Sequence, residues 1–131
     1  MIEVSYSHNK DGTGELVEKT TQVTTYQELC DLIDAYPWDT EIALFEKSGV
    51  GGGITVVSGD VKQQCASYLL IPVETGKALL NLDILLKPGF LAIFGRKATS
   101  TDFGEMTVKE AKLKLKELFD HSIASLYQKY K

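Results

Sequence analysis

Alternation of apolar and polar side chains marks the start of the chain as a strand. Ile2, Val4 and Tyr6 occupy every second position, which is the period of a strand with one buried face. A turn-forming segment, residues 9–14, separates them from a Thr-rich stretch over residues 15–23. The pattern therefore predicts an opening β-hairpin.

The next segment changes to helical spacing. Its apolar residues recur at intervals of three and four, at Tyr26, Leu29, Ile33 and Tyr36. Thr24 or Thr25 can serve as the N-cap, because a Gln or Glu follows each of them three residues later. Pro37 ends the pattern. We expect a helix over about residues 25–36.

The middle of the chain favours short strands. Segments with alternating, β-branched or continuous apolar character are residues 41–47, 54–58, 65–73, 81–86 and 90–94. Pro72 lacks an amide proton, which predicts an edge or a bulge near the end of its strand. A helical turn is the alternative for residues 77–86. The apolar segment 90–94 is expected to be a central strand, and residues 95–106 to be a polar connection.

The last quarter of the chain predicts one long helix. From Val108 onward, apolar residues recur at helical spacing for more than five turns. Thr107 precedes this stripe, and Glu110 follows three residues later, which is the signature of a capping box. We expect this second helix to cover about residues 108–129.

These elements predict an α+β fold. Short connections between the strands favour a mostly antiparallel β-sheet of about five to seven strands, with the two helices, about 25–36 and 108–129, packed on it. A chain of 131 residues is of the size of one domain, so we expect a single domain over residues 1–131. We find no internal repeat and no linker.

Composition favours a soluble cytoplasmic protein. Met1 leads directly into the first strand pattern, without the basic and apolar regions of a signal peptide. No apolar run approaches the length of a membrane span. Cys30 and Cys65 stand 35 positions apart, which favours two buried free thiols in a reducing compartment, with a disulfide as the alternative.

Charge is distributed unevenly along the chain. Residues 1–60 have a net charge of −8 and residues 61–131 a net charge of +4. Such an asymmetry can create a signed surface field that speeds the encounter with a partner of opposite charge. The alternative is that the two halves interleave in the fold and their fields cancel.

Motifs for catalysis or cofactor binding are missing from the sequence. The glycine-rich segment 49–53 resembles a phosphate loop, but no Lys-Ser/Thr follows it and a strand is expected next. We interpret it as a hairpin loop or a place where backbone packs closely. His8 and His121 are far apart in sequence, and neither cysteine has a neighbouring histidine. We therefore expect no enzyme activity, no cofactor and no metal.

Acidic residues on and after the first helix are the candidate binding site. Three of them recur every third position on the face away from the apolar stripe, and an aromatic residue and two more acids follow. The candidate contacts are Glu28, Asp31, Asp34, Trp38, Asp39 and Glu41. An acidic patch with one aromatic anchor can dock a basic protein. The alternative is a solvated helix face.

Lysines of the last helix suggest nucleic-acid binding, which we consider the weaker hypothesis. Acidic residues stand four positions from Lys109, Lys114 and Lys116 and can neutralise them. The stacking aromatic residues that single-strand binding requires do not interleave with these lysines. We expect a solvated helix face and no direct nucleic-acid contact.

The second half of the chain resembles a family of bacterial immunity proteins. Three strand segments, 54–57, 68–71 and 90–95, precede Thr101-Asp102-Phe103 and the capped helix that begins after Thr107. This order is similar to that of immunity proteins encoded beside contact-dependent and other polymorphic toxins, over roughly residues 42–119. The resemblance implies an α+β protein without an active site that binds and stoichiometrically inhibits the catalytic domain of a cognate toxin, a nuclease by expectation, in the cytoplasm. The competing hypothesis is a small regulatory or ligand-binding domain that dimerises through an edge strand.

Overall fold

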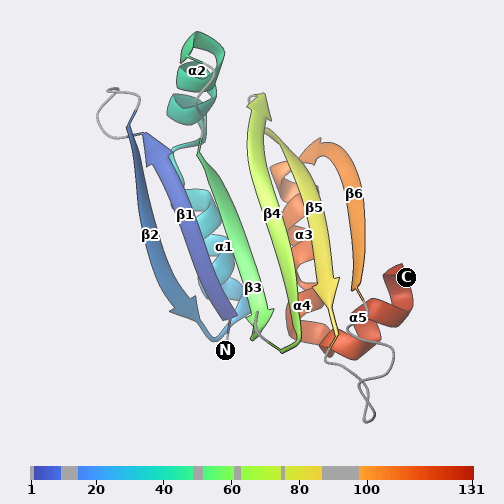
Figure 1. The fold of residues 1–131 in the computed structure, drawn as a ribbon. Coiled ribbons are helices and arrows are strands. Elements are labelled where there is room, and N and C mark those ends of the chain that lie inside the picture. Colours follow the sequence, from blue (N-terminus) through green and yellow to red (C-terminus); the bar gives the residue numbers. More distant parts are fainter. Residues whose placement is uncertain (1, 10–14, 49–51, 61–62, 75, 87–97) are drawn as a thin grey trace.

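The computed structural model describes residues 2–9, 15–48, 52–60, 63–74, 76–86 and 98–131. One antiparallel sheet and a layer of helices make up this part of the chain (Figure 1). The strands are β1 (Ile2–Asn9), β2 (Leu16–Val23), β3 (Gly53–Gly59), β4 (Cys65–Glu74), β5 (Lys77–Leu85) and β6 (Ala98–Thr107). The helices are α1 (Tyr26–Ala35), α2 (Trp38–Ser48), α3 (Val108–Leu115), α4 (Glu117–Asp120) and α5 (Ile123–Tyr130). The predicted α+β class is confirmed.

The sheet has the order β2-β1-β3-β4-β5-β6, and all its neighbouring strands are antiparallel. The predicted opening hairpin is correct, with Ile2 opposite Val23 and Asn9 opposite Leu16. The described sheet of six strands also agrees with the predicted number. The register between β4 and β5 shifts between Pro72 and Glu74, so the expected irregularity at the proline is present.

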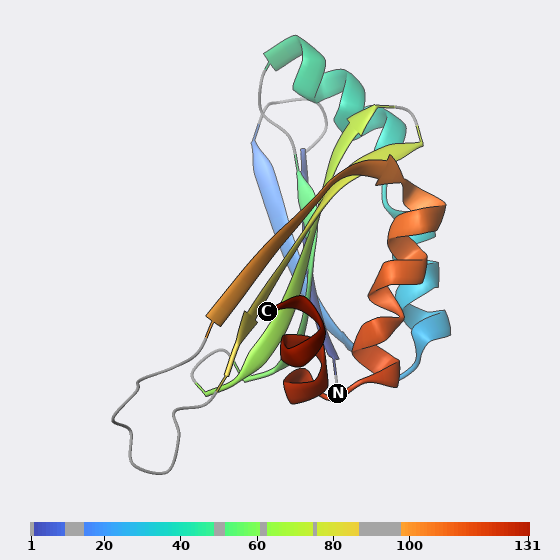
Figure 2. The same cartoon turned by 90° about the vertical axis from the view of Figure 1, so that its right-hand side faces the viewer.

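Helices cover one face of the sheet, as Figure 2 shows. The core lies between them and consists of inward side chains such as Val4, Val56, Tyr68, Leu70 and Leu82, each at most 1% exposed. Helix α1 supplies Leu29 and Ile33 to this core, and α3 supplies Ala111 and Leu115. The opposite face of the sheet carries no described helix (Figure 2).

Helix α1 agrees with the prediction, and α2 corrects it. Thr25 is the N-cap of α1 and accepts a hydrogen bond from the amide of Glu28. Residues 41–47 were expected to form a strand, but they belong to α2. Apolar side chains at Trp38 and Ile42 also fit helical spacing, and acids in the first turn favour a helix N-terminus. The carbonyl of Pro37 accepts the first helical hydrogen bond, from the amide of Glu41, at 3.0 Å.

Strand β5 confirms one prediction, and β6 corrects another. Residues 77–85 form a strand, which excludes the helical alternative for that segment. The expected polar connection over residues 95–106 is strand β6 from Ala98 onward. Because β6 is an edge strand, its outward side chains are polar, and a register shift opposite Leu80 and Asn81 interrupts the alternation. Gly104 has a φ of +74° at this irregularity, a conformation that favours glycine.

The predicted long C-terminal helix is interrupted. The capping box at its start is confirmed, since Thr107 accepts from the amide of Glu110 at 3.1 Å and donates to its carboxylate at 3.0 Å. The helical path then breaks at His121, which is extended with φ −128° and ψ 151°. Ser122 caps a new helix, α5, by accepting from the amide of Ser125. This turn brings Leu126 into the core, where it is 1% exposed.

Several predictions lie outside the described residues. They are the strand at 90–94, most of the turn at 9–14 and residues 49–51 of the glycine-rich segment. Gly52 and Gly53 of that segment are described, and Gly52 confirms the expected close backbone packing. A Cβ atom added there would lie 1.9 Å from the carbonyl oxygen of Ser7.

Candidate functional site

Glu28, the first predicted contact, is engaged at the start of α1. Its carboxylate accepts hydrogen bonds from the hydroxyls of Thr24, at 2.7 Å, and Thr25, at 3.2 Å. These bonds, Thr24 foremost, lower the pKa of Glu28 below its usual value because they favour the charged form. Glu28 therefore stabilises the helix start while it remains exposed.

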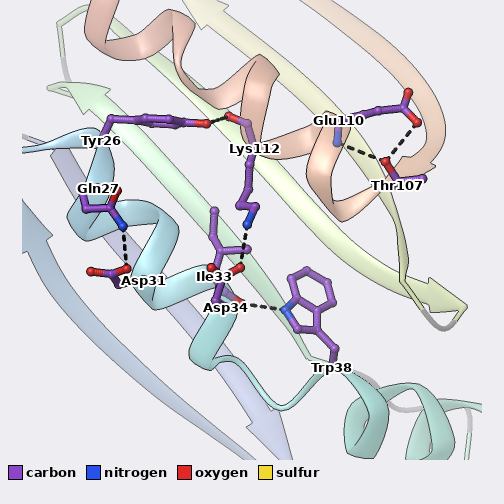
Figure 3. A network of polar contacts seen from close by, with 9 residues as sticks. All are labelled: Tyr26, Gln27, Asp31, Ile33, Asp34, Trp38, Thr107, Glu110 and Lys112. Atoms are coloured by element: carbon purple, nitrogen blue, oxygen red, sulfur yellow. Dashed lines mark hydrogen bonds and ion pairs between the residues drawn. The ribbon is translucent and has the colours of Figure 1, made fainter.

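Asp31 and Asp34 point to different neighbours (Figure 3). The amide group of Gln27 donates to Asp31 at 2.9 Å within α1. Asp34 instead forms an ion pair with Lys112 of α3, with Nζ and Oδ1 2.7 Å apart. The Tyr26 hydroxyl also reaches α3 and donates to the carbonyl oxygen of Lys112 at 2.6 Å. Asp34 thus serves the contact between the two helices, and its charge is balanced within the protein.

The remaining predicted contacts, Trp38, Asp39 and Glu41, lie at the start of α2. The indole of Trp38 is half-buried, donates to the carbonyl oxygen of Ile33 at 2.7 Å and packs edge-on against Tyr36. Asp39 is exposed, whereas Glu41 is only 1% exposed. Burial and the nearby charge of Glu41 both raise the pKa of Tyr36. Glu41 is therefore not the surface residue that the sequence suggested, and the roles of the other five residues as contacts stay predictions.

A different surface, the uncovered face of the sheet, combines apolar and acidic side chains. Strand alternation places Val57 of β3, Leu69 and Ile71 of β4, and Leu79 of β5 on this face. All four are half-buried. We call these residues the apolar stripe. They occupy β3, β4 and β5, three neighbouring interior strands of the described sheet. Ile71, near the end of β4, also lines a small hollow with Glu41 and Phe45 of α2.

Carboxylates flank the apolar stripe on both sides. Five exposed acids project from this face and form what we call the acidic rim: Glu3 and Glu18 on β1 and β2, Asp83 on β5, and Asp102 and Glu105 on β6. Two of them are oriented by neighbours. The Ser100 hydroxyl donates to Asp83, and the amide of Gly104 donates to Asp102 at 2.8 Å.

Three lysines of the helical layer are engaged by neighbouring side chains. Lys114 lies over the ring of Phe103, 5.0 Å from its centroid. Lys129 pairs with Glu117, with Nζ and Oε1 2.7 Å apart. Lys112 is likewise paired, with Asp34. These interactions engage lysines of the C-terminal segment, which the sequence suggested as a nucleic-acid surface. The acidic rim and these lysines lie on opposite sides of the sheet.

The two oppositely charged halves of the sequence lie side by side. Strands β2, β1 and β3 belong to residues 1–60, and β4, β5 and β6 to residues 61–131. They are therefore adjacent blocks rather than interleaved strands. Charges of the two halves nevertheless meet in the fold, since Asp34 of α1 pairs with Lys112 of α3.

The described residues contain no group of three or more His, Cys, Asp or Glu side chains that could bind a metal ion. Cys30 and Cys65 are not joined by a disulfide; Cys65 is buried, as expected, whereas Cys30 is half-buried. None of the helices in the described part of the chain has the length and apolar content that crossing a bilayer requires. What this arrangement offers is a surface: an apolar stripe between two rows of carboxylates.

Comparison of the chain with protein-family models, with curated proteins and with solved structures found no match.

Proposed function

We propose that this chain is an immunity protein, which binds a basic catalytic domain of a toxin through the uncovered face of its sheet and blocks that domain stoichiometrically. The observation that supports the proposal most is the apolar stripe between the two rows of the acidic rim. An apolar centre surrounded by polar residues is the usual anatomy of a protein–protein interface.

Strand β4 illustrates the argument. Leu69, Leu70 and Ile71 follow one another, so the strand is apolar on both faces. Leu70 is fully buried against the helices, while Leu69 and Ile71 are on the uncovered face. A strand that meets water on one face normally alternates apolar with polar residues. The departure from alternation in β4 is explained if a partner covers the second face.

The size of the face fits this role. Six strands spaced about 4.8 Å apart, with about eight residues each rising about 3.3 Å, present on the order of 700 Å². A stable complex buries about 800 Å² on each partner. The uncovered face is therefore large enough to account for most of one specific interface.

Charge indicates the class of the partner. The rim places carboxylates on both sides of the stripe, and no ion pair is formed by Glu3, Glu18 or Glu105 with other described residues. A nuclease binds a polyanion and therefore has a cationic cleft. An acidic face complements such a cleft and speeds association with it. We accordingly propose a nuclease domain as the partner, and the cytoplasm of the producing cell as the place of action.

The test uses the catalytic C-terminal domain encoded by the gene immediately upstream. Native mass spectrometry and calorimetry should detect a tight 1:1 complex, and its formation should abolish nuclease activity. The affinity should fall as salt rises from 50 to 500 mM, because screening weakens the charge complementarity. Absence of binding, together with thermal stabilisation by a small metabolite or with dimerisation through the edge strand β2, would refute the proposal in favour of a regulatory domain.

A further inference from the structure

The uncovered face contains a hollow of about 280 Å³ between Glu18 of β2 and the apolar residues of β4. It lies where β3 begins, at Gly53, whose neighbour across the sheet in β1 is Ser7. Because Gly53 has no side chain, the row of side chains that crosses the sheet is interrupted there. A Cβ atom at this position would lie 3.1 Å from the carbonyl oxygen of Leu70, so the backbones approach closely.

The walls of the hollow differ in character. Leu69 and Ile71 of β4 line one side, and the hydroxyl residues Ser5 and Ser7 of β1 line the other. Glu18 of β2 contributes an exposed carboxylate beyond the serines. Among the described residues this carboxylate has no cationic partner. The hollow therefore has an apolar wall, a polar wall and an unbalanced negative charge.

Both serine hydroxyls are held in place by neighbours. The Ser7 hydroxyl oxygen accepts from the amide of Gly53 at 3.3 Å, and the Ser5 hydroxyl is 3.2 Å from that of Thr20. Their oxygens retain lone pairs that can accept further hydrogen bonds. A ligand with several donors in one plane would find acceptors at Glu18 and at these hydroxyls.

We propose that this hollow receives one arginine side chain of the partner domain, an assignment that rests on the proposed function. The aliphatic stem of arginine packs against Leu69 and Ile71 while its charged head stays in the polar part. The guanidinium group donates five hydrogen bonds in a planar fork, and a carboxylate such as Glu18 accepts two of them side by side. Buried arginines of this kind are frequent anchors of protein interfaces.

Other ligand classes fit the hollow less well. An anionic ligand would be repelled by Glu18. A neutral metabolite would shield the Glu18 carboxylate from water without supplying a counter-charge, which is unfavourable. A long cationic side chain satisfies the apolar wall and the charge together, and arginine, with five donors in a planar fork, engages these acceptors better than lysine with three.

The first test addresses the hollow directly, with the isolated protein and two small probes. Titration with N-acetylarginine amide, followed by NMR, should shift the amide signals of Ser7, Gly53 and Leu69, with a dissociation constant on the order of 1 mM. N-acetylcitrulline amide has the same shape without the charge and should cause no shift. Equal shifts with both probes, or no shift with either, would overturn the assignment.

The second test separates the hollow from the proposed function as a whole. Glu18→Gln removes the charge and Gly53→Ala fills part of the space, and each should weaken binding of the upstream-encoded domain on the order of thirtyfold. Glu3→Gln, an identical change on the same face outside the hollow, should weaken it less than about threefold. Melting temperatures show whether each variant is folded. A complex of unchanged affinity in Glu18→Gln would refute the arginine site and leave the immunity role standing, whereas no complex with the wild-type protein would refute the role itself.

Discussion

Replacing Glu117 with glutamine should destabilise the fold by detaching the C-terminal helix from its anchor. The Glu117 carboxylate is 15% exposed and accepts hydrogen bonds from Tyr130 at 2.6 Å, Lys129 at 2.7 Å and Tyr68 at 3.3 Å. These bonds connect α4 to α5 and to the central strand β4. Tyr68 is itself fully buried, so its hydroxyl has no access to water as a substitute.

The magnitude follows from the environment of each bond. The Lys129 side chain is half exposed, so water screens its ion pair and most of the loss comes from the two tyrosines. The glutamine side chain keeps one oxygen as an acceptor, but its NH₂ group replaces the other oxygen and faces hydroxyl and ammonium donors. This loss should lower the free energy of unfolding by about 2 kcal/mol. For a chain of 131 residues this lowers the melting temperature on the order of 8 °C.

The loss of stability in Glu117→Gln should also depend on pH. Burial acts to raise the pKa of Glu117, but hydrogen bonds from Lys129 and Tyr130 and the charges of Lys129 and Lys114 outweigh it, so the pKa lies below the usual 4.5. A carboxylate whose pKa is lower in the folded state stabilises the fold fully above its unfolded pKa. That stabilisation disappears as the pH falls through the folded pKa. The difference between wild type and Glu117→Gln should therefore be constant above about pH 5.5 and shrink below pH 4.5.

Urea unfolding followed by circular dichroism at pH 7, 5 and 3.5 measures this difference. Glu105→Gln is the matched control, because Glu105 is exposed on β6 and its replacement should change stability by less than about 0.5 kcal/mol. A Glu117→Gln variant as stable as wild type at pH 7, or a difference that persists undiminished at pH 3.5, would refute the reasoning.

Three other substitutions test separate parts of the structure by urea unfolding. Gly52→Ala should lower the free energy of unfolding by about 2–3 kcal/mol, because the added Cβ atom would lie 2.4 Å from the Tyr36 hydroxyl. A variant of wild-type stability would show that the backbone is less tightly packed there. Thr107→Ala should cost about 1 kcal/mol by removing the cap of α3, and Thr107→Ser should restore most of it. Tyr26→Phe should cost about 1 kcal/mol, since it removes the hydroxyl that donates to the carbonyl of Lys112 at 2.6 Å; no change would mean that water replaces this bond.

The sequence predicted correctly those elements whose apolar periodicity and neighbouring turn or cap residues all favour the same secondary structure. The opening hairpin, α1 and the capping box at Thr107 each combine a periodic apolar pattern with a turn or cap that lies next to it in sequence. Such signals depend on neighbours within a few residues. They are therefore visible without knowledge of the three-dimensional fold.

The errors arose where one pattern fits two structures. The apolar residues of segment 41–47 satisfy alternation, but together with Trp38 they also satisfy helical spacing, and the tertiary contacts of Ile42 favour α2. Strand β6 was missed because an edge strand with a register shift has little apolar alternation. In the last helix, the apolar spacing continued across His121, although the chain turns there and Ser122 starts a new helix.

The candidate site could be predicted only in part. Acidic character in the first half was visible, but sequence could not show that Asp34 pairs with Lys112 or that Glu41 is buried. Those facts depend on contacts between residues far apart in the chain. One signal for the uncovered face was present: the uninterrupted apolar run Leu69-Leu70-Ile71, which is unusual for a strand that is covered on one side only.

The most direct test of the account is a calorimetric comparison of two double variants with equal change of charge. Glu3→Lys/Glu105→Lys reverses exposed acids of the uncovered face, and Asp31→Lys/Asp120→Lys reverses exposed acids of the helical layer. If the uncovered face is the docking surface, the first variant should lose affinity for the upstream-encoded domain by on the order of a hundredfold, and the second by less than about fivefold. The opposite result, with affinity lost only in Asp31→Lys/Asp120→Lys, would contradict the account and place the interface on the helical layer.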